Sequence, residues 1–104
     1  MSDKLAHMVY FQLNEPTPEN VQHLVAECQK YLNDHDGLDY FAVGTLTPDL
    51  NREVNVMDFQ VSLHTIFESR EAHDKYQVAE RHLQFIESNK ATWKSVRVFD
   101  TDLK

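Results

Sequence analysis

The sequence is short of glycine, cysteine and proline, and the first two shortages exclude particular kinds of site. Only two glycines, Gly37 and Gly44, occur in 104 residues, so no glycine-rich loop is available to bind phosphate groups. The single cysteine, Cys28, excludes an intrachain disulfide and is typical of a protein in a reducing compartment. Because Cys28 falls on the apolar stripe of a predicted helix, we expect a buried structural thiol rather than a nucleophile.

Long hydrophobic runs are also missing. No apolar stretch approaches the ~20 residues that a membrane-spanning helix needs. The start of the chain, Met1–Lys4, has none of the features of a signal peptide. We therefore expect a cytoplasmic protein that has no membrane partner.

Positive charge is scarce as well. The chain carries 10 lysines and arginines against 17 aspartates and glutamates, which gives a formal net charge of -7. Binding to a phosphate backbone needs clustered lysine and arginine side chains. The composition therefore excludes nucleic acid as an expected partner, and we attribute the excess of acidic residues to solubility.

The histidines and aspartates show no spacing typical of a metal site. Four histidines lack both a cysteine partner and a second histidine at i, i+4: His23, His35, His64 and His73. The acidic turn Asp34–Asp39 lacks the ligand spacing of a calcium loop. We therefore predict no metal and no organic cofactor.

Hydrophobic periodicity divides the chain into six elements of a single domain that spans residues 1–104. Alternation of apolar and polar side chains predicts strands, and apolar residues at helical spacing predict helices. The elements, in order, are strand Leu5–Leu13, helix Pro18–Leu32, strand Leu38–Leu46, strand Met57–Phe67, a helical region that Ser69 can cap and that extends to about Trp93, and strand Val96–Asp100.

The order strand, helix, strand, strand, helix, strand predicts an α+β fold. It is typical of a ferredoxin-like sandwich, a four-stranded antiparallel sheet with helices on one face. In the first strand, His7 shares the inward face with Val9 and Phe11. In the strand at 57–67, alternation places Phe59 on the same face as Val61, under the helices.

The other face of the predicted sheet is only half polar. Met8, Tyr10 and Ile66 share it with Gln60 and Ser62. An apolar face of this kind is a common interaction surface. We therefore predict a homodimer in which two sheets face each other, a dimeric α+β barrel with its helices outside.

Several residues along the chain together resemble the stress-responsive A/B barrel, or Dabb, family. The resemblance extends from about Leu5 to Asp100, and any one of its marks is weak alone. The marks are His7, Gly37, Gly44, Phe67–Ser69, Tyr76, His82, Trp93 and Asp100.

The resemblance implies a site made of Tyr76, His82 and His7. Plant cyclases of this family, which form olivetolic acid, catalyse an aldol condensation without metal or organic cofactor. They use a tyrosine and a histidine of the helical segment, assisted by a strand histidine, in an internal cavity. A neutral imidazole can remove a proton next to a carbonyl, and a phenol can donate to the carbonyl oxygen that becomes an enolate.

Whether Tyr76 and His82 converge depends on the helical region between them. Family members often have a His-Pro pair shortly before the second residue, where this chain has Ala79–Arg81. On an unbroken helix, positions six residues apart lie about 120° apart around the axis. We hypothesise a break between Val78 and Arg81, because an unbroken helix would point Phe85 to solvent.

The alternative is a continuous helix with a purely structural role for these residues. Its apolar stripe would then consist of Ala72, Tyr76, Ala79, Leu83 and Ile86, with His82 at the edge. His7 would be a hydrogen-bonded core histidine.

Two functions of different classes remain open. The first is binding of a small, largely apolar molecule in a pocket between sheet and helices, with no assigned turnover and a connection to stress. The alternative is a cofactor-independent cyclase or lyase that acts on a carbonyl or polyketide-like substrate through Tyr76 and His82. Fold analogy with other dimeric α+β barrels adds a cofactor-free monooxygenase as a third. An open cavity lined by all three residues would favour the enzyme, and a filled core would not.

Overall fold

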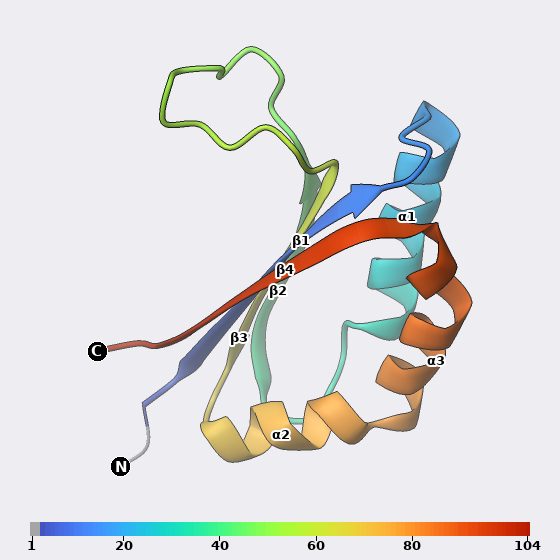
Figure 1. The fold of residues 1–104 in the computed structure, drawn as a ribbon. Coiled ribbons are helices and arrows are strands. Elements are labelled where there is room, and N and C mark those ends of the chain that lie inside the picture. The colour runs from blue at the N-terminus through green and yellow to red at the C-terminus, as the bar shows by residue number, and fades with distance from the viewer. Residues whose placement is uncertain (1–2) are drawn as a thin grey trace.

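The computed structural model describes residues 3–104, so Met1 and Ser2 of the predicted start lie outside it. Four strands form one sheet, and the helices lie across one of its faces (Figure 1). The elements are β1 (Leu5–Leu13), α1 (Pro18–Tyr31), β2 (Leu38–Thr45), β3 (Val61–Phe67), α2 (Arg70–Val78), α3 (Glu80–Asn89), the short 3₁₀ helix η1 (Lys90–Thr92) and β4 (Trp93–Asp102).

The sheet confirms the predicted ferredoxin-like α+β fold. Its strand order is β2-β3-β1-β4, and each neighbouring pair is antiparallel. The register places His7 opposite Thr65 on one side and opposite Asp100 on the other. Among residues 3–104, no helix is long and apolar enough to cross a membrane.

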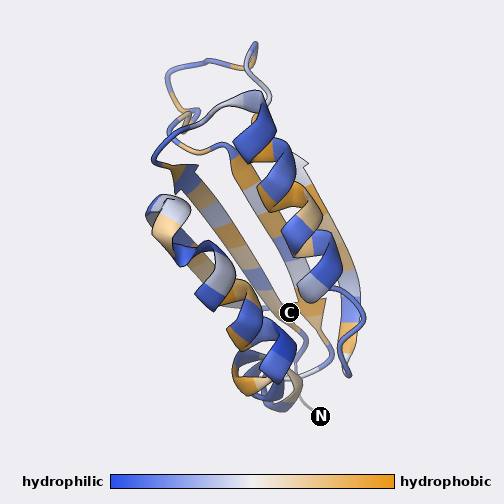
Figure 2. Ribbon diagram, turned by 90° about the vertical axis from the view of Figure 1, so that its right-hand side faces the viewer, coloured by the Kyte–Doolittle hydropathy of each residue, from blue (hydrophilic) through white to orange (hydrophobic). Residues whose placement is uncertain are grey.

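The core lies between the helices and the inward face of the sheet. Figure 2 shows hydrophobic positions alternating with polar ones along the strands behind the helices. Val9 and Phe11 of β1 and Leu63 of β3 pack there with Leu24 of α1. Cys28 is fully buried in this core, and burial raises the pKa of its thiol to about 12, which confirms the structural thiol.

Both long helical segments begin where their capping residues predict. The Thr17 side chain accepts a hydrogen bond from the backbone N–H of Asn20, and Ser69 accepts one from Ala72. Gly37 follows α1 with φ of 78°, where a Cβ atom would lie 2.5 Å from the Cβ of Ala72. The glycine therefore allows the start of α2 to approach the turn after α1.

The predicted strand Met57–Phe67 is wrong in its first four residues. β3 begins at Val61, because its partner β2 ends opposite this residue, at Thr45. Before it, the Asp58 carboxylate pairs with Arg97 at 2.8 Å and holds the chain beside β4. Phe59 consequently lies against Tyr10 on the open face, not under the helices as alternation predicts; their ring centroids are 5.1 Å apart.

The last strand is longer than predicted at both ends. β4 runs over Trp93–Asp102 instead of Val96–Asp100, since η1 ends the helical region at Thr92. β1 is long enough to pair with almost the whole of this strand.

The hypothesised break in the second helical region is confirmed. α2 ends at Val78, and Ala79 is extended, with φ of -64° and ψ of 142°. Arg81 donates to the backbone carbonyls of Lys30 at 2.8 Å and Asn33 at 3.0 Å, just where α1 ends. An arginine that bonds the free carbonyls of one helix thus holds the start of α3 in place without a proline.

Candidate functional site

A cavity of about 160 Å³ lies between the sheet and the helices, and we call it the inner cavity. Its lining is mostly apolar, and its polar members are the three predicted residues, Gln77 and Trp93. His7 comes from β1, Tyr76 from α2 and His82 from α3. Residues far apart in the sequence therefore meet at one place.

Of the three predicted residues, Tyr76 lies in the middle, with His7 on one side and His82 on the other. The ring centroids of Tyr76 and His82 are 4.6 Å apart, and those of His7 and Tyr76 are 6.1 Å apart. All three side chains are buried, His82 being 8% exposed. Leu83 is 52% exposed, so the alternative of a continuous apolar stripe through Leu83 is wrong. The break turns His82 and Phe85 inward instead.

Three of the residues that line the inner cavity each carry a buried polar atom that lacks a hydrogen-bond partner among residues 3–104. These atoms are the hydroxyl of Tyr76, Nδ1 of His82 and Nε1 of Trp93. Buried polar groups almost always have a partner in folded proteins. Leaving one unsatisfied costs about 1–3 kcal/mol, so three around one cavity require an explanation.

The electrostatics keep both helical residues neutral at pH 7. The pKa of His82 is lowered to about 4, mainly by burial and in smaller part by the nearby His7, His35 and His73. A backbone hydrogen bond with Gln77 opposes these effects in part. Burial also raises the pKa of Tyr76, and the Cys28 thiol acts in the same direction. Tyr76 therefore stays a hydrogen-bond donor, and the neutral His82 ring keeps one nitrogen able to accept.

His7 has a hydrogen-bond partner that the sequence does not predict for the site. Its Nδ1 lies 2.5 Å from Oδ1 of Asp100, the residue opposite it on β4. Burial lowers the pKa of His7, although the hydrogen bond and the charge of Asp100 oppose this. The pair resembles a histidine oriented by a carboxylate, which leaves Nε2 as the second functional nitrogen.

Two further histidines adjoin the site. His73 of α2 lies 5.0 Å from His7, and His35, in the turn after α1, lies 4.9 Å from Tyr76, both measured between ring centroids. Sequence spacing gave no sign of either, because both reach the site only through the fold. Of the residues that join the site only in the structure, Asp100 is the one that the sequence could indicate. Strand alternation places its side chain on the helix-facing side of β4, together with Val98.

Within the part of the chain that the structure describes, three side chains here lie close enough together to hold a metal ion. One ligand atom each of His7, His73 and Asp100 lie within 4.8 Å of one another. Two imidazoles and a carboxylate suit zinc or iron. The same side chains are already satisfied by hydrogen bonds, His7 with Asp100 and His73 with Asp74 at 3.0 Å. The predicted absence of a metal site therefore stays a prediction.

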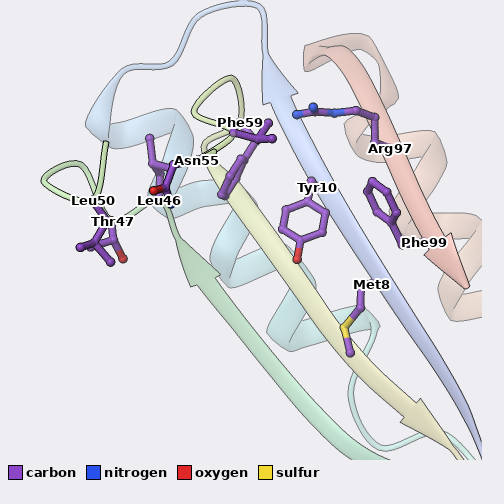
Figure 3. A pocket seen from close by; sticks show the side chains of 10 residues that line it. Met8, Tyr10, Leu46, Thr47, Leu50, Asn55, Phe59, Arg97 and Phe99 are labelled. Carbon is purple, nitrogen blue, oxygen red and sulfur yellow. The ribbon is translucent and has the colours of Figure 1, made fainter. Parts of the chain in front are cut away.

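A second, larger pocket of about 480 Å³ lies on the face of the sheet opposite the helices, and we call it the open-face pocket. Figure 3 shows Tyr10 between Phe59 and Phe99, with Met8 and Arg97 beside them. The ring of Tyr10 meets those of Phe59 and Phe99 edge to face, at centroid distances of 5.1 and 5.8 Å. This face is the one that the sequence predicts to be half apolar.

Comparison with known families identifies one match. The model of the Dabb family, described as the Stress Responsive A/B Barrel Domain, matches residues 5–103. Among curated proteins, none matches the chain significantly.

Solved structures share the fold over nearly the whole chain. A Dabb family protein with a ferredoxin-like fold from Mesorhizobium loti is 14% identical and covers 99% of each chain, with a TM-score of 0.82. A dimeric ferredoxin-like protein from Thermobifida fusca is 13% identical over 99% of this chain and 93% of its own, with a TM-score of 0.79. A hydroxynitrile lyase from Passiflora edulis is 14% identical over 100% and 96%, with a TM-score of 0.79. At such identities the likeness shows the fold.

Proposed function

Because the chain belongs to the stress-responsive A/B barrel (Dabb) family, we propose that it binds a small, largely apolar molecule in the inner cavity. The observation that carries this proposal is the pair of unsatisfied buried atoms, the Tyr76 hydroxyl and His82 Nδ1, on adjacent rings. A ligand oxygen that accepts from Tyr76, or a ligand hydroxyl that donates to His82, would recover the hydrogen bonds that the fold leaves unmade.

The size of the inner cavity limits the ligand. At about 160 Å³ it is close to an engineered protein cavity of ~150 Å³ that takes up benzene. The ligand should therefore be a ring or short chain of about that size, smaller than a polyketide with a long side chain. Because Tyr76 and His82 are neutral at pH 7, the cavity favours an uncharged ligand.

Cyclohexanone is a suitable probe, since it has one carbonyl oxygen on a ring of the right size. Binding followed by calorimetry should be weakened about 5–10-fold in Tyr76→Phe, in line with the loss of one hydrogen bond. His82→Ala should also weaken binding, because it removes the imidazole ring against which the body of cyclohexanone packs. Leu83→Ala, on the same helix but exposed, is the matched control and should bind as the unaltered protein does. Equal affinity in all four proteins would contradict the proposal.

A second candidate is a cofactor-independent cyclase or lyase of aldol type. The pairing of His7 with Asp100 near the ring of Tyr76 favours it, and the similar fold of a hydroxynitrile lyase is consistent with it. With a pKa of about 4, His82 is a weak base, so His7 would be the better group to remove a proton. Exchange of the α-protons of cyclohexanone in D₂O, followed by NMR, tests this. Exchange no faster than in buffer, or unchanged in Tyr76→Phe, would exclude it.

We also propose that the open face of the sheet pairs with a second copy of the chain. Phe99 is 55% exposed there beside Tyr10, and structures of similar fold are described as dimeric. A cytoplasmic location remains a prediction from the sequence, and a connection to stress comes from the family name alone.

A further inference from the structure

Trp93 reaches the inner cavity because of an irregularity in β4. Ser95 pairs with Gln12 and Trp93 pairs with Leu13, so Lys94 is an extra residue without a partner on β1. Side chains alternate along a regular strand, and a regular β4 would place Trp93 on the open face with Ser95 and Arg97. The bulge moves Trp93 to the helix-facing side, opposite Leu13.

On that side the indole ring packs against other aromatic rings of the core. Its centroid lies 5.1 Å from that of Phe11 and 5.7 Å from that of Phe85. Phenylalanine would supply the same packing without a polar atom. The Trp93 N–H is nevertheless buried without a partner in residues 3–104, although buried tryptophans usually find one.

Trp93 therefore brings an unpartnered donor to the lining of the cavity from its sheet side, in addition to the two polar side chains from its helix side. Trp93 belongs to β4, whereas Tyr76 and His82 belong to α2 and α3. An indole N–H only donates, so it requires an acceptor on the ligand. Among the described residues 3–104, no lysine or arginine lines the inner cavity, so no side chain there favours a negatively charged acceptor.

We propose that the Trp93 N–H is a specificity-determining group of the inner cavity, and that it selects uncharged ring compounds with a second acceptor oxygen. The first oxygen accepts from the Tyr76 hydroxyl and, where it is a hydroxyl, also donates to His82, and the second oxygen accepts from Trp93. This inference rests on the proposed function, because it adds one contact to the same site. Hydroxy- or keto-substituted ketones of about the size of cyclohexanone are the ligand class that fits.

Three rings of nearly equal size test the proposal, namely cyclohexane, cyclohexanone and cyclohexane-1,4-dione, which carry no oxygen, one oxygen and two opposed oxygens. Trp93 is the single tryptophan of the chain, so the indole N–H gives one resonance in a ¹H–¹⁵N spectrum. The dione should move this proton downfield and slow its exchange with solvent, and cyclohexane should not. Trp93→Phe should weaken dione binding about 3–10-fold, the loss of one hydrogen bond, and leave cyclohexane binding unchanged.

The outcomes separate this inference from the proposed function. If the rings bind but the indole proton does not respond to the dione, or Trp93→Phe weakens all three equally, Trp93 only packs and the inference is overturned. If none of the rings binds the unaltered protein, the proposed function fails first and the inference fails with it. If Trp93→Phe does not fold, the response of the indole N–H resonance to the dione in the unaltered protein still tests whether Trp93 donates to the ligand.

Discussion

At the scale of single residues, the site is defined by side chains that the fold buries without satisfying. Tyr76 and His82 meet because α2 stops at Val78 and α3 restarts at Glu80. Burial holds both in their neutral forms, which suits hydrogen bonding to an uncharged ligand more than strong acid–base chemistry. His7 differs, since Asp100 orients its ring.

The low pKa of His82 makes folding stability depend on pH. In the folded protein its pKa is about 4, and in the unfolded chain it should be near the ordinary value of ~6.5. Between these values the unfolded chain binds more protons, so stability is full above about pH 6.5 and falls as the pH drops toward 4. We expect His82 to contribute a loss of roughly 2–3 kcal/mol between pH 7 and about pH 4.5.

Urea unfolding at the two pH values measures this loss. His82→Gln should remove a large part of the pH dependence, and the remainder should come from His7, whose pKa burial also lowers. His23→Gln, on the exposed part of α1, is the control and should keep the full dependence. The same pH dependence in His82→Gln as in the unaltered protein would show that this ring is not buried as described.

At the scale of elements, the decisive feature is the junction of α2 and α3. Arg81 bonds the backbone carbonyls at the end of α1, so one side chain fixes both the end of the first helix and the start of α3. Because these hydrogen bonds are charge-assisted, Arg81→Met should lower the free energy of unfolding by about 1–2 kcal/mol. It should also weaken cyclohexanone binding, because His82, the next residue in the chain, lines the inner cavity and depends on the position of α3.

Arg70→Met is the matched control for this change. Arg70 is an exposed arginine of α2 that pairs with Asp74 four residues on, so its loss should leave unfolding and binding nearly unchanged. Urea unfolding and calorimetry on both variants give the comparison. If Arg81→Met has the same free energy of unfolding as Arg70→Met, the hydrogen bonds of Arg81 do not stabilise the junction.

The sequence predicts most elements because their patterns are local. It also predicts the helix break, since Phe85 would otherwise face solvent. Alternation fails at Phe59, because a period of two continues into residues that have no strand to pair with. The bulge at Lys94 and the approach of Asp100 to His7 depend on the register between β1 and β4. No local pattern in either strand predicts that register, because the two strands are far apart in the sequence.

At the scale of the whole molecule, the two faces of the sheet differ in what covers them. The inner cavity lies between the helices and the inward face, and the open face carries the aromatic cluster of Tyr10, Phe59 and Phe99 (Figure 3). A dimer that pairs the open faces would bury this cluster and leave the helices outside.

Sedimentation equilibrium tests the dimer. At tens of micromolar, an ordinary range for such interfaces, the mass should be twice the 12.2 kDa of one chain. Phe99→Glu should give monomers, because it places a charge in the proposed interface. Leu83→Glu, equally exposed but on the helix side, should stay dimeric. A mass of about 12.2 kDa for the unaltered protein, that of a monomer, would contradict the proposed dimeric barrel.

The most direct measurement is a crystal structure of the protein with cyclohexanone. The expected result places the ring in the inner cavity, with its carbonyl oxygen within hydrogen-bond distance of the Tyr76 hydroxyl and its body against His82 and Phe85. A ring found only in the open-face pocket, or an inner cavity closed by Tyr76 bonding to His82 with no ligand between them, would contradict the proposed function.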